Sequence, residues 1–336
     1  MKQNSPSERL MGPINGYLVS QALHVVATLG IADLLKDGPR CAEELAATTA
    51  TQPDVLYRLL RALAAIDVFR EDANHCFALT EMGECLREDA PEPVAAWAAN
   101  IGQPYVWAAT GALLHSVRCG ESGFHSVHGT DPWNYRASHP HEAGVFDRAM
   151  TELSRRASAG VVAAYPFGEF RRIADIGGGN GALLAAILEA NPHALGVLFD
   201  QPHVMAGCAA VLKASGVANR CECIGGNFFE AVPAGCDVYL LKSVLHDWGD
   251  EKAVAILRTC RAAIPQNGRL LAVERVVGPP GQQPTAKFAD LNMLVMLGAR
   301  ERTEQEFVEL FDAAEFVVAR IVPASLGYCI IECKPR

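Results

Sequence analysis

The sequence predicts an α/β protein in which a helical N-terminal part precedes a larger, mostly parallel sheet. One observation is the stretch Ile173–Asp200, where a short apolar segment, a glycine turn, a helical pattern and a second apolar segment follow one another. The other is that further strand-like segments, at 221–224, 238–241 and 269–277, alternate with helical patterns. This alternation is typical of a parallel sheet covered by helices.

The stretch Ile173–Asp200 also predicts a nucleoside site. The glycines Gly177–Gly179 follow the first strand directly, and Asn191-Pro192 ends the helix because proline cannot continue it. Glycines allow a ligand to approach the backbone closely. Asp200, at the end of the second strand, can accept hydrogen bonds from two ribose hydroxyls.

The choice of nucleoside depends on Asp175. The pattern Gly177-x-Gly179-x-x-Ala182 also satisfies the loose dinucleotide fingerprint. A carboxylate at position 175 can bind the amino end of a cofactor that carries an amino acid, whereas it would repel a pyrophosphate. We therefore favour S-adenosylmethionine over NAD, with a glycine turn that serves packing alone as an alternative.

Composition limits the partners and the compartment. The 336 residues are long enough for two domains, and the net charge of −9 argues against a nucleic-acid partner. No apolar run reaches the ~18 residues that a membrane span requires, and the polar start is unlike a signal peptide. The eleven cysteines lack paired CxxC spacing, which predicts a cytoplasmic protein with mostly buried free thiols and no metal. The five histidines between 115 and 141 indicate a solvated loop.

The first 93 residues predict a winged-helix-like domain. Residues 1–10 are polar and expected to fray, residues 16–35 form a helix, and residues 41–65 read as helix, turn and helix before a hairpin near 76–79. Residues 1–100 hold eight Lys/Arg against fourteen Asp/Glu, so DNA binding is disfavoured. The apolar helix is better explained as a dimerisation surface.

A helical linker, 94–168, and a catalytic domain, 169–336, are expected to follow. In the linker, helix is predicted over 94–117 and 142–164, with a loop from 120 to 133. The C-terminal domain ends in two strands, 317–322 and 328–332, that can pair antiparallel, which gives seven strands in all. Thr303 and Glu306 form a capping box at the start of a helix.

Several motifs together carry a family resemblance. They are Asp-Ile-Gly-Gly-Gly at 175–179, Phe-Asp-x-Pro-His at 199–203, Leu-Lys-x-Val-Leu-His-Asp-Trp at 241–248, Glu274, and Arg-Glu-Arg-Thr at 300–303. The chain resembles class I S-adenosylmethionine-dependent O-methyltransferases of the caffeate/hydroxyindole type, above all the bacterial members that act on natural products. The resemblance covers nearly the whole chain. It implies a Rossmann-like seven-stranded sheet, a winged-helix dimerisation domain, a homodimer and a small aromatic substrate.

The resemblance also assigns site residues. The expected catalytic residues are His246 as general base with Glu274, Glu301 and Asp247. The expected cofactor-binding residues are Asp175, Gly177, Gly179, Asp200, Asn227, Phe228, Lys242 and Ser154. The expected substrate residues are Asn100, Gln103, Phe146, Met150, Asn292 and Met293. Two positions depart from the family pattern: Asn227 replaces an aspartate, and Glu315 replaces a glycine.

The proposed chemistry follows from the side chains themselves. A phenol has a pKa near 10, so about one molecule in a thousand is ionised at pH 7. An imidazole is suited to removing that proton, and a carboxylate on its other nitrogen fixes the tautomer. Alternatives are methylation of a ring nitrogen, a pericyclic or hydroxylation reaction, a NAD-dependent oxidoreductase, a binding-only module, and a structural role for His246.

Overall fold

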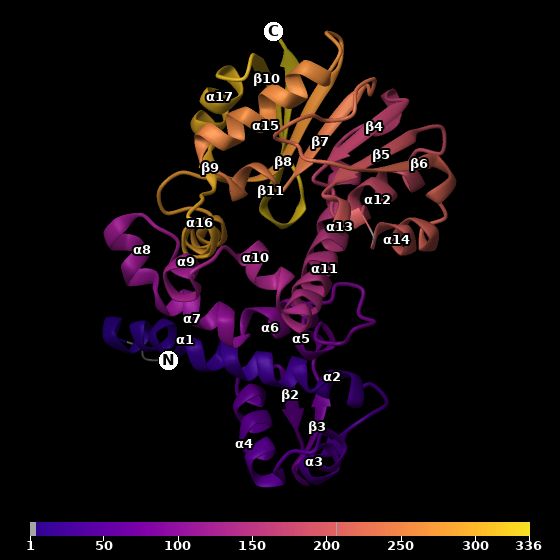
Figure 1. Ribbon diagram of the computed structural model, residues 1–336. Helices are drawn as coiled ribbons and strands as arrows, with labels where there is room; N and C mark the ends of the chain where they lie inside the picture. Colours follow the sequence, from indigo (N-terminus) through magenta and orange to yellow (C-terminus); the bar gives the residue numbers. More distant parts are fainter. Residues whose placement is uncertain (1–4, 206) are drawn as a thin grey trace. The chain divides into compact units, whose positions relative to one another are not determined.

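The computed structural model describes residues 5–205 and 207–336, and the chain forms two compact units (Figure 1). The first unit contains the chain up to Ala108 together with Arg136–Leu153. The second contains Ala109–Tyr135 and Ser154–Arg336. The segment 94–168, expected as a linker, contributes residues to both units.

The first unit has the predicted winged-helix pattern. Its elements are α1 (Pro6–Thr28), α2 (Ile31–Leu34), β1 (Arg40–Cys41), α3 (Ala42–Thr49), α4 (Pro53–Ala64), β2 (Phe69–Glu71), β3 (Cys76–Leu79), α5 (Glu81–Glu84), α6 (Ala95–Ile101) and α7 (Pro104–Gly111), which runs on past the unit's boundary. The three strands pair antiparallel in the order β1-β3-β2. Leu45, Leu60 and Phe77 are fully buried between these helices and the hairpin, because the apolar face of α4 needs a partner surface.

The prediction that residues 1–10 fray is wrong for the part that the structure describes. Helix α1 begins at Pro6, and the Ser5 side chain caps it by accepting from Glu8 N while Glu8 accepts from Ser5 N. This capping box satisfies backbone donors that a polar start would otherwise leave open. Residues 1–4 lie outside the described residues. Several large apolar side chains of α1 are exposed: Leu10, Met11, Ile14, Tyr17 and Leu18.

The prediction of mostly buried free thiols is also wrong. Cys41 and Cys76 are opposite each other in the β1–β3 register and form a disulfide. Of the nine free thiols in the described part of the chain, four are buried. Cross-strand pairing brought the two cysteines together, and sequence spacing gives no sign of such a pairing.

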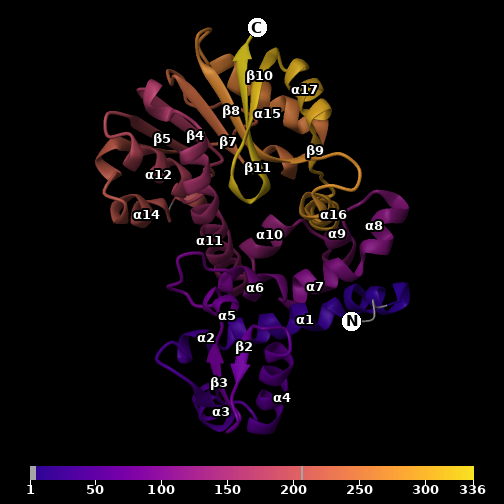
Figure 2. The same cartoon turned by 180° about the vertical axis from the view of Figure 1, so that it is seen from behind.

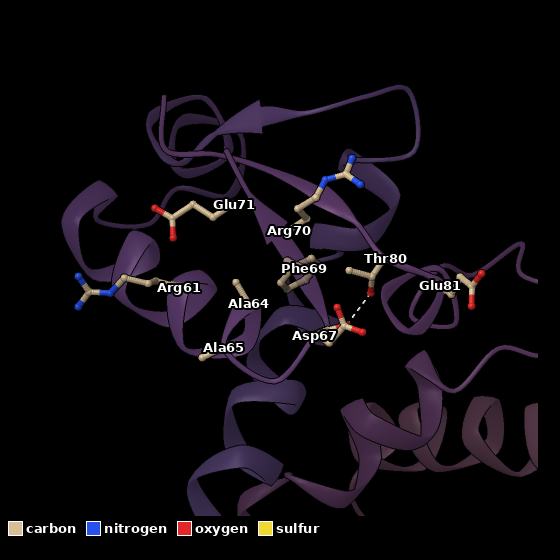
Figure 3. Close-up of a pocket in the computed structure, with 9 residues that line it drawn as sticks. All are labelled: Arg61, Ala64, Ala65, Asp67, Phe69, Arg70, Glu71, Thr80 and Glu81. Atoms are coloured by element: carbon tan, nitrogen blue, oxygen red, sulfur yellow. Dashed lines mark hydrogen bonds between the residues drawn. The ribbon is translucent and has the colours of Figure 1, made fainter. Parts of the chain in front are cut away.

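A hollow of about 730 Å³ lies beside α4 and β2 in the first unit (Figure 3). Two arginines line it, Arg61 and Arg70, and three acids lie around them, Asp67, Glu71 and Glu81. This mixture is not the positive surface that a nucleic-acid backbone requires, in agreement with the acidic balance of the sequence.

The second unit is built on one long sheet. Its strands are β4 (Arg172–Ile176), β5 (Leu195–Asp200), β6 (Cys221–Gly225), β7 (Val238–Lys242), β8 (Arg269–Val277), β9 (Arg302–Thr303), β10 (Phe316–Pro323) and β11 (Tyr328–Pro335). Seven of them follow the order β10-β11-β8-β7-β4-β5-β6, and the short β9 pairs with β8. The five strands from β8 to β6 are parallel, and β10 and β11 are antiparallel. The predicted seven-stranded sheet is confirmed, with β9 as an addition.

Helices cover both faces of this sheet (Figures 1 and 2). One face packs against α12 (Ala182–Ala190), α14 (Cys208–Ala214) and the end of α11 (Pro140–Ala164). The other packs against α15 (Asp250–Ala263) and α17 (Glu304–Asp312), which starts at the predicted Thr303 capping box. The remaining elements are α8 (Leu113–Cys119), α9 (Gly123–His128), α10 (Pro132–Ala137), α13 (Pro202–Met205), α16 (Pro284–Leu297), and the 3-10 turns η1 (Phe167–Glu169), η2 (Ala218–Arg220), η3 (Leu245–Asp247) and η4 (Ser325–Gly327).

The predicted loop at 120–133 is instead partly helical. Ser122 caps α9 by accepting from His125 N, and its hydroxyl lies 3.1 Å from the carbonyls of Val295 and Met296 at the end of α16. A tertiary contact therefore stabilises a segment whose glycine, serine and histidine content indicated a loop. In the parts of the chain that the structure describes, no helix combines the length and the apolar character of a membrane span.

Candidate active site

The glycine loop after β4 holds the carboxylate of Asp200. Gly177 and Gly179 adopt φ angles of 69° and 59°, a region that favours glycine. Gly179 N donates to Asp200 Oδ2 at 2.9 Å, and Gln201 N donates to Asp200 Oδ1 at 2.7 Å. Burial raises the pKa of Asp200, and these two backbone donors oppose the rise. The carboxylate is thus oriented in advance, with lone pairs left for further donors.

Asp175 lies directly beneath the same loop. It is 1% exposed, and neither carboxylate oxygen has a hydrogen-bond partner among the described residues. A Cβ at Gly178 would lie 2.7 Å from Asp175 Cγ, so only glycine fits there. Burial raises the pKa of Asp175 to about 7, while the charge of Lys242 opposes the rise. A buried carboxylate without a partner fits the cationic amino group of S-adenosylmethionine.

Phe228 and Lys242 border the loop on the side of β7. A Cβ at Gly177 would lie 3.6 Å from the Phe228 ring, and Lys242 Nζ donates to Ser154 Oγ at 3.3 Å. The predicted cofactor residues in β4 to β7 and the loops after them all belong to the carboxyl ends of parallel strands, which is where ligands bind in open α/β sheets.

Asn227 is already engaged at both ends of its amide. Its Nδ2 donates to Glu230 Oε1 at 2.9 Å, and its Oδ1 accepts from Phe229 N at 3.1 Å. The oxygen must therefore share its lone pairs if it is also to accept from an adenine amino group.

Three carboxylates surround the His246 side chain, which is 7% exposed on η3. Its Nδ1 lies 3.2 Å from Glu301 Oε1 and 3.4 Å from Glu274 Oε2. Its Nε2 lies 3.4 Å from Asp247 Oδ1. The structure therefore brings the four predicted catalytic residues together.

Glu274 also fixes the turn that carries His246. Its Oε1 accepts from Val244 N at 3.0 Å and from Leu245 N at 2.8 Å, which supplies the partner that a buried carboxylate was expected to need. Glu301 is held in turn, because its backbone N donates to Asp290 Oδ1 at 2.9 Å.

The three acids control the protonation of His246. Burial alone would lower the pKa of its imidazole, but the charges of Glu274, Asp247 and Glu301 outweigh burial and raise it to about 10. The surrounding acids therefore favour the protonated form of the imidazole. Its pKa is close to that of a phenol, so a proton between the two groups is shared nearly evenly.

Among the residues that the structure describes, two groups of side chains have donor atoms close enough to hold a metal ion. One is the buried set of His246, Glu274 and Glu301, and the other is the exposed set of His115, Cys119 and Glu121. In the buried set, the positive charge of the imidazolium offsets the negative charges of the two carboxylates, as a metal ion would. The expectation of a metal-free site stays a prediction.

The predicted substrate residues belong to both units. In the first unit, Asn100 is buried and accepts from Tyr105 OH at 3.5 Å, Gln103 precedes α7, and Phe146 and Met150 lie one turn apart on α11. In the second unit, Asn292 and Met293 are half-buried on α16, which packs against η3.

Sequence reasoning missed three residues around this cluster: Arg275, Arg302 and Tyr328. Arg275 Cζ lies 4.5 Å from the Tyr328 ring centroid, and its Nη1 lies 3.9 Å from Glu301 Oε1. Tyr328 OH lies 3.2 Å from Ser243 Oγ. Arg302 was visible only as part of the Arg-Glu-Arg-Thr motif, and the other two carried no signal beyond their strands.

Comparison with known proteins agrees with this geometry. The family model for the O-methyltransferase domain matches residues 111–317, and the model for the O-methyltransferase dimerisation domain matches residues 11–89. The chain belongs to the O-methyltransferase family. A phenazine O-methyltransferase, PhzM, from Lysobacter antibioticus is 43% identical over 98% of this chain and 96% of that protein.

Two further relatives bear on fold and reaction. The crystal structure of LaPhzM matches with a TM-score of 0.94 at 43% identity, covering 99% of this chain and all of that one. An 8-amino-8-demethylriboflavin N,N-dimethyltransferase from Streptomyces davaonensis is 38% identical over 94% of this chain and 92% of that protein. Several similar structures contain S-adenosylmethionine or S-adenosylhomocysteine.

The predicted family, fold and cofactor are therefore confirmed. The protein is an S-adenosylmethionine-dependent O-methyltransferase with an N-terminal dimerisation domain. The roles assigned to individual site residues remain predictions.

Proposed function

We propose that the enzyme methylates a hydroxyl of a small phenolic or heteroaromatic molecule in natural-product biosynthesis, with His246 as the general base. The observation that carries the proposal is the pairing of His246 Nδ1 with Glu301 and Glu274, which orients the ring. The names of the relatives, among them a phenazine O-methyltransferase and a 3-amino-4-hydroxybenzoate 4-O-methyltransferase, support an aromatic hydroxyl as the acceptor.

The residues of the chain divide the chemical task. When bound, S-adenosylmethionine supplies a methyl group on a sulfonium, which is transferred by direct displacement. Asp200 is expected to hold the ribose hydroxyls and Asp175 to face the amino group, so that the donor is positioned before the acceptor arrives. His246 Nε2 takes the hydroxyl proton of a phenol, whose ionisation in water at pH 7 costs about 4 kcal/mol. This transfer starts from the neutral imidazole, and because the surrounding acids favour the imidazolium, turnover should rise with pH.

The acids around His246 make this proton transfer possible in a buried site. The imidazolium that forms would be costly without counter-charges, and Glu301 and Glu274 provide them at Nδ1. Asp247 Oδ1 lies 3.4 Å from Nε2 and adds a further negative charge that stabilises the imidazolium. The pKa of about 10 for His246 means that little free energy separates the imidazole–phenol and imidazolium–phenolate pairs.

A nitrogen acceptor is the second candidate. The relative named as an N,N-dimethyltransferase shows that an amine-methylating protein can be 38% identical to this chain. An amine with a free lone pair depends less on a base, and the intact His246 cluster therefore favours the hydroxyl.

For assembly we propose a homodimer in the cytoplasm. The exposed apolar side chains of Met11, Ile14, Tyr17 and Leu18 in α1 lie within residues 11–89, the segment that matches the dimerisation-domain model. Light scattering should give twice the chain mass of 36.0 kDa. A monomer at micromolar concentration would argue against this assembly.

The test of the proposed reaction uses methyl-labelled S-adenosylmethionine and a panel of hydroxylated phenazines, naphthoates and benzoates. We expect an O-methylated product in equal amount to S-adenosylhomocysteine, with His246→Ala as the control that stays largely inactive. Label on nitrogen would support the second candidate. Conversion of substrate without S-adenosylhomocysteine would contradict methyl transfer.

A further inference from the structure

Arg302 is a fully buried guanidinium that contacts both ends of the turn carrying His246. Its exposed fraction is 0%. Nη1 donates to the carbonyl of Leu245 at 2.8 Å, and Nη2 donates to the carbonyl of Trp248 at 2.7 Å. These two carbonyls lie just before His246 and just after Asp247 in the chain. The guanidinium therefore spans the segment that carries the base.

The turn needs such support because it has little internal structure. The η3 turn is three residues long, and two backbone hydrogen bonds close it, from Asp247 N to Val244 O at 3.2 Å and from Trp248 N to Leu245 O at 3.3 Å. Short 3-10 turns are weakly held by their own hydrogen bonds. A planar guanidinium can hold two carbonyls in fixed directions, which a single flexible ammonium cannot do.

The same turn is held from its other side by Glu274. That carboxylate, on β8, accepts from the backbone N–H groups of Val244 and Leu245. The backbone carbonyls of the turn instead accept from Arg302, on β9. Strands β8 and β9 pair in parallel register, with Val276 opposite Arg302. Glu301, next to Arg302, faces His246 Nδ1. Strands β8 and β9 thus fix both the imidazole ring of His246 and the backbone of the turn that carries it.

The charge of Arg302 is balanced locally. Its Nε and Nη2 donate to Asp250 Oδ1 at 3.0 and 2.8 Å. Burial of a charged side chain is a weak source of stability, and an apolar residue of similar volume is often equally stable. The contacts of Arg302 with the two carbonyls and Asp250 are therefore better explained by the position that they give to the turn.

We propose that Arg302 is a positioning residue for methyl transfer, which sets the distance between His246 Nε2 and the acceptor hydroxyl. The inference rests on the proposed role of His246 as the base. Arg302 touches neither cofactor nor substrate in this scheme and acts only through the turn.

Arg300 offers a matched control. It also donates to Asp250, at 2.8 Å, but its side chain is 45% exposed, and its ion pairs within the described residues are with Asp250 and Glu306 rather than with the turn. Arg300→Met removes the same charge next to the same acid. Arg300→Met therefore controls for the loss of a positive charge beside Asp250, and Arg302→Lys, which keeps the charge at the buried position, controls for that charge.

The experiment compares Arg302→Met, Arg302→Lys and Arg300→Met with the wild-type enzyme. We expect kcat to fall by ~10–100-fold in both Arg302 variants, because a small misplacement of a reacting group has this effect, and S-adenosylhomocysteine affinity to stay within about twofold. The loss should shrink for a more acidic phenol, which depends less on the base. Arg300→Met should stay within about twofold of wild type in both quantities.

Hydrogen exchange supplies a readout that does not need activity. The backbone amides of 244–248 should exchange faster in Arg302→Lys than in Arg300→Met, while the amides of β4 and β5 should not change. Equal exchange in the two variants would overturn the inference, as would a loss of kcat that is independent of phenol acidity. If the wild-type enzyme showed no methyl transfer to hydroxyls, the proposed function would fail, and the exchange comparison would still decide the contact of Arg302.

Discussion

The cofactor end and the base end of this site are built in opposite ways. Around the glycine loop, Asp175 has no hydrogen-bond partner in the described structure, and Asp200 is held only by backbone N–H groups. At the other end, His246 faces three carboxylates. Groups that bind a ligand are thus left open for it, whereas the group that performs the proton transfer is oriented before any ligand arrives.

This comparison predicts that the two ends control different quantities. Changes at the glycine loop should alter cofactor affinity, and changes at the His246 cluster should alter turnover. Each variant below is expected to change one quantity and leave the other nearly constant.

The largest expected effect comes from His246→Ala. Turnover should fall by ~10²–10⁴-fold, because the imidazole that accepts the proton is removed, while calorimetry should show nearly unchanged S-adenosylhomocysteine affinity. A more acidic phenol should partly restore activity. Retention of more than about half of the wild-type turnover would show that the histidine is structural.

Asp200→Ala should have the converse effect. Loss of the acceptor for two ribose hydroxyls should weaken S-adenosylhomocysteine binding by about 100-fold, while kcat at saturating cofactor should change little. Asp200→Asn is the matched control, because it keeps the shape and part of the accepting capacity. NADH should bind to neither variant nor to wild type, and measurable NADH binding by the wild-type enzyme would argue against the cofactor assignment.

Glu301→Gln should have an intermediate effect on turnover, of about tenfold. The amide can still orient the ring but removes one of the charges that raise the pKa of His246. That pKa should therefore fall, and the rise of kcat with pH should move to lower pH than in wild type. An unchanged pH profile would mean that Glu301 does not act on the imidazole.

Asn227 should have the smallest effect. Asn227→Asp adds a stronger acceptor but places a second charge next to Glu230, which the amide now contacts at 2.9 Å. The single variant should therefore bind S-adenosylhomocysteine about as tightly as wild type, whereas Asn227→Asp with Glu230→Gln should bind about threefold more tightly. Calorimetry on both variants separates the two contributions, and equal affinity would place residue 227 away from the adenine.

The sequence predicted the cofactor end more completely than the base end for a physical reason. The glycine loop and Asp200 belong to one contiguous strand–helix–strand unit, so local spacing was enough to place them. The base end is assembled from η3, β8, β9 and β11, and the roles of Arg302 and Tyr328 depend on strand pairing that no local pattern encodes. Motifs of the family identified the acids Glu274 and Glu301 at this end. They did not identify Arg302 and Tyr328, which lie around these acids.

Tertiary structure also explains one local error and one unusual residue. The segment after Gly120 folds into α9 because Ser122 contacts the distant end of α16. Glu315, which stands where the family has glycine, adopts a φ of 62° that the following strand pairing imposes on it. In both cases tertiary structure overrides what the local residues favour.

The most direct test of the central claim is the pH dependence of the single-turnover rate for one phenol whose own pKa lies well below 10, in the wild-type enzyme and in His246→Ala. In wild type the rate should rise with pH through a titration well above 6.5, because the surrounding acids raise the pKa of His246 to about 10. In the alanine variant the rate should be lower at every pH below the phenol's own pKa and should follow only the ionisation of the phenol. Two profiles of the same shape and height would contradict the assignment of His246 as the base.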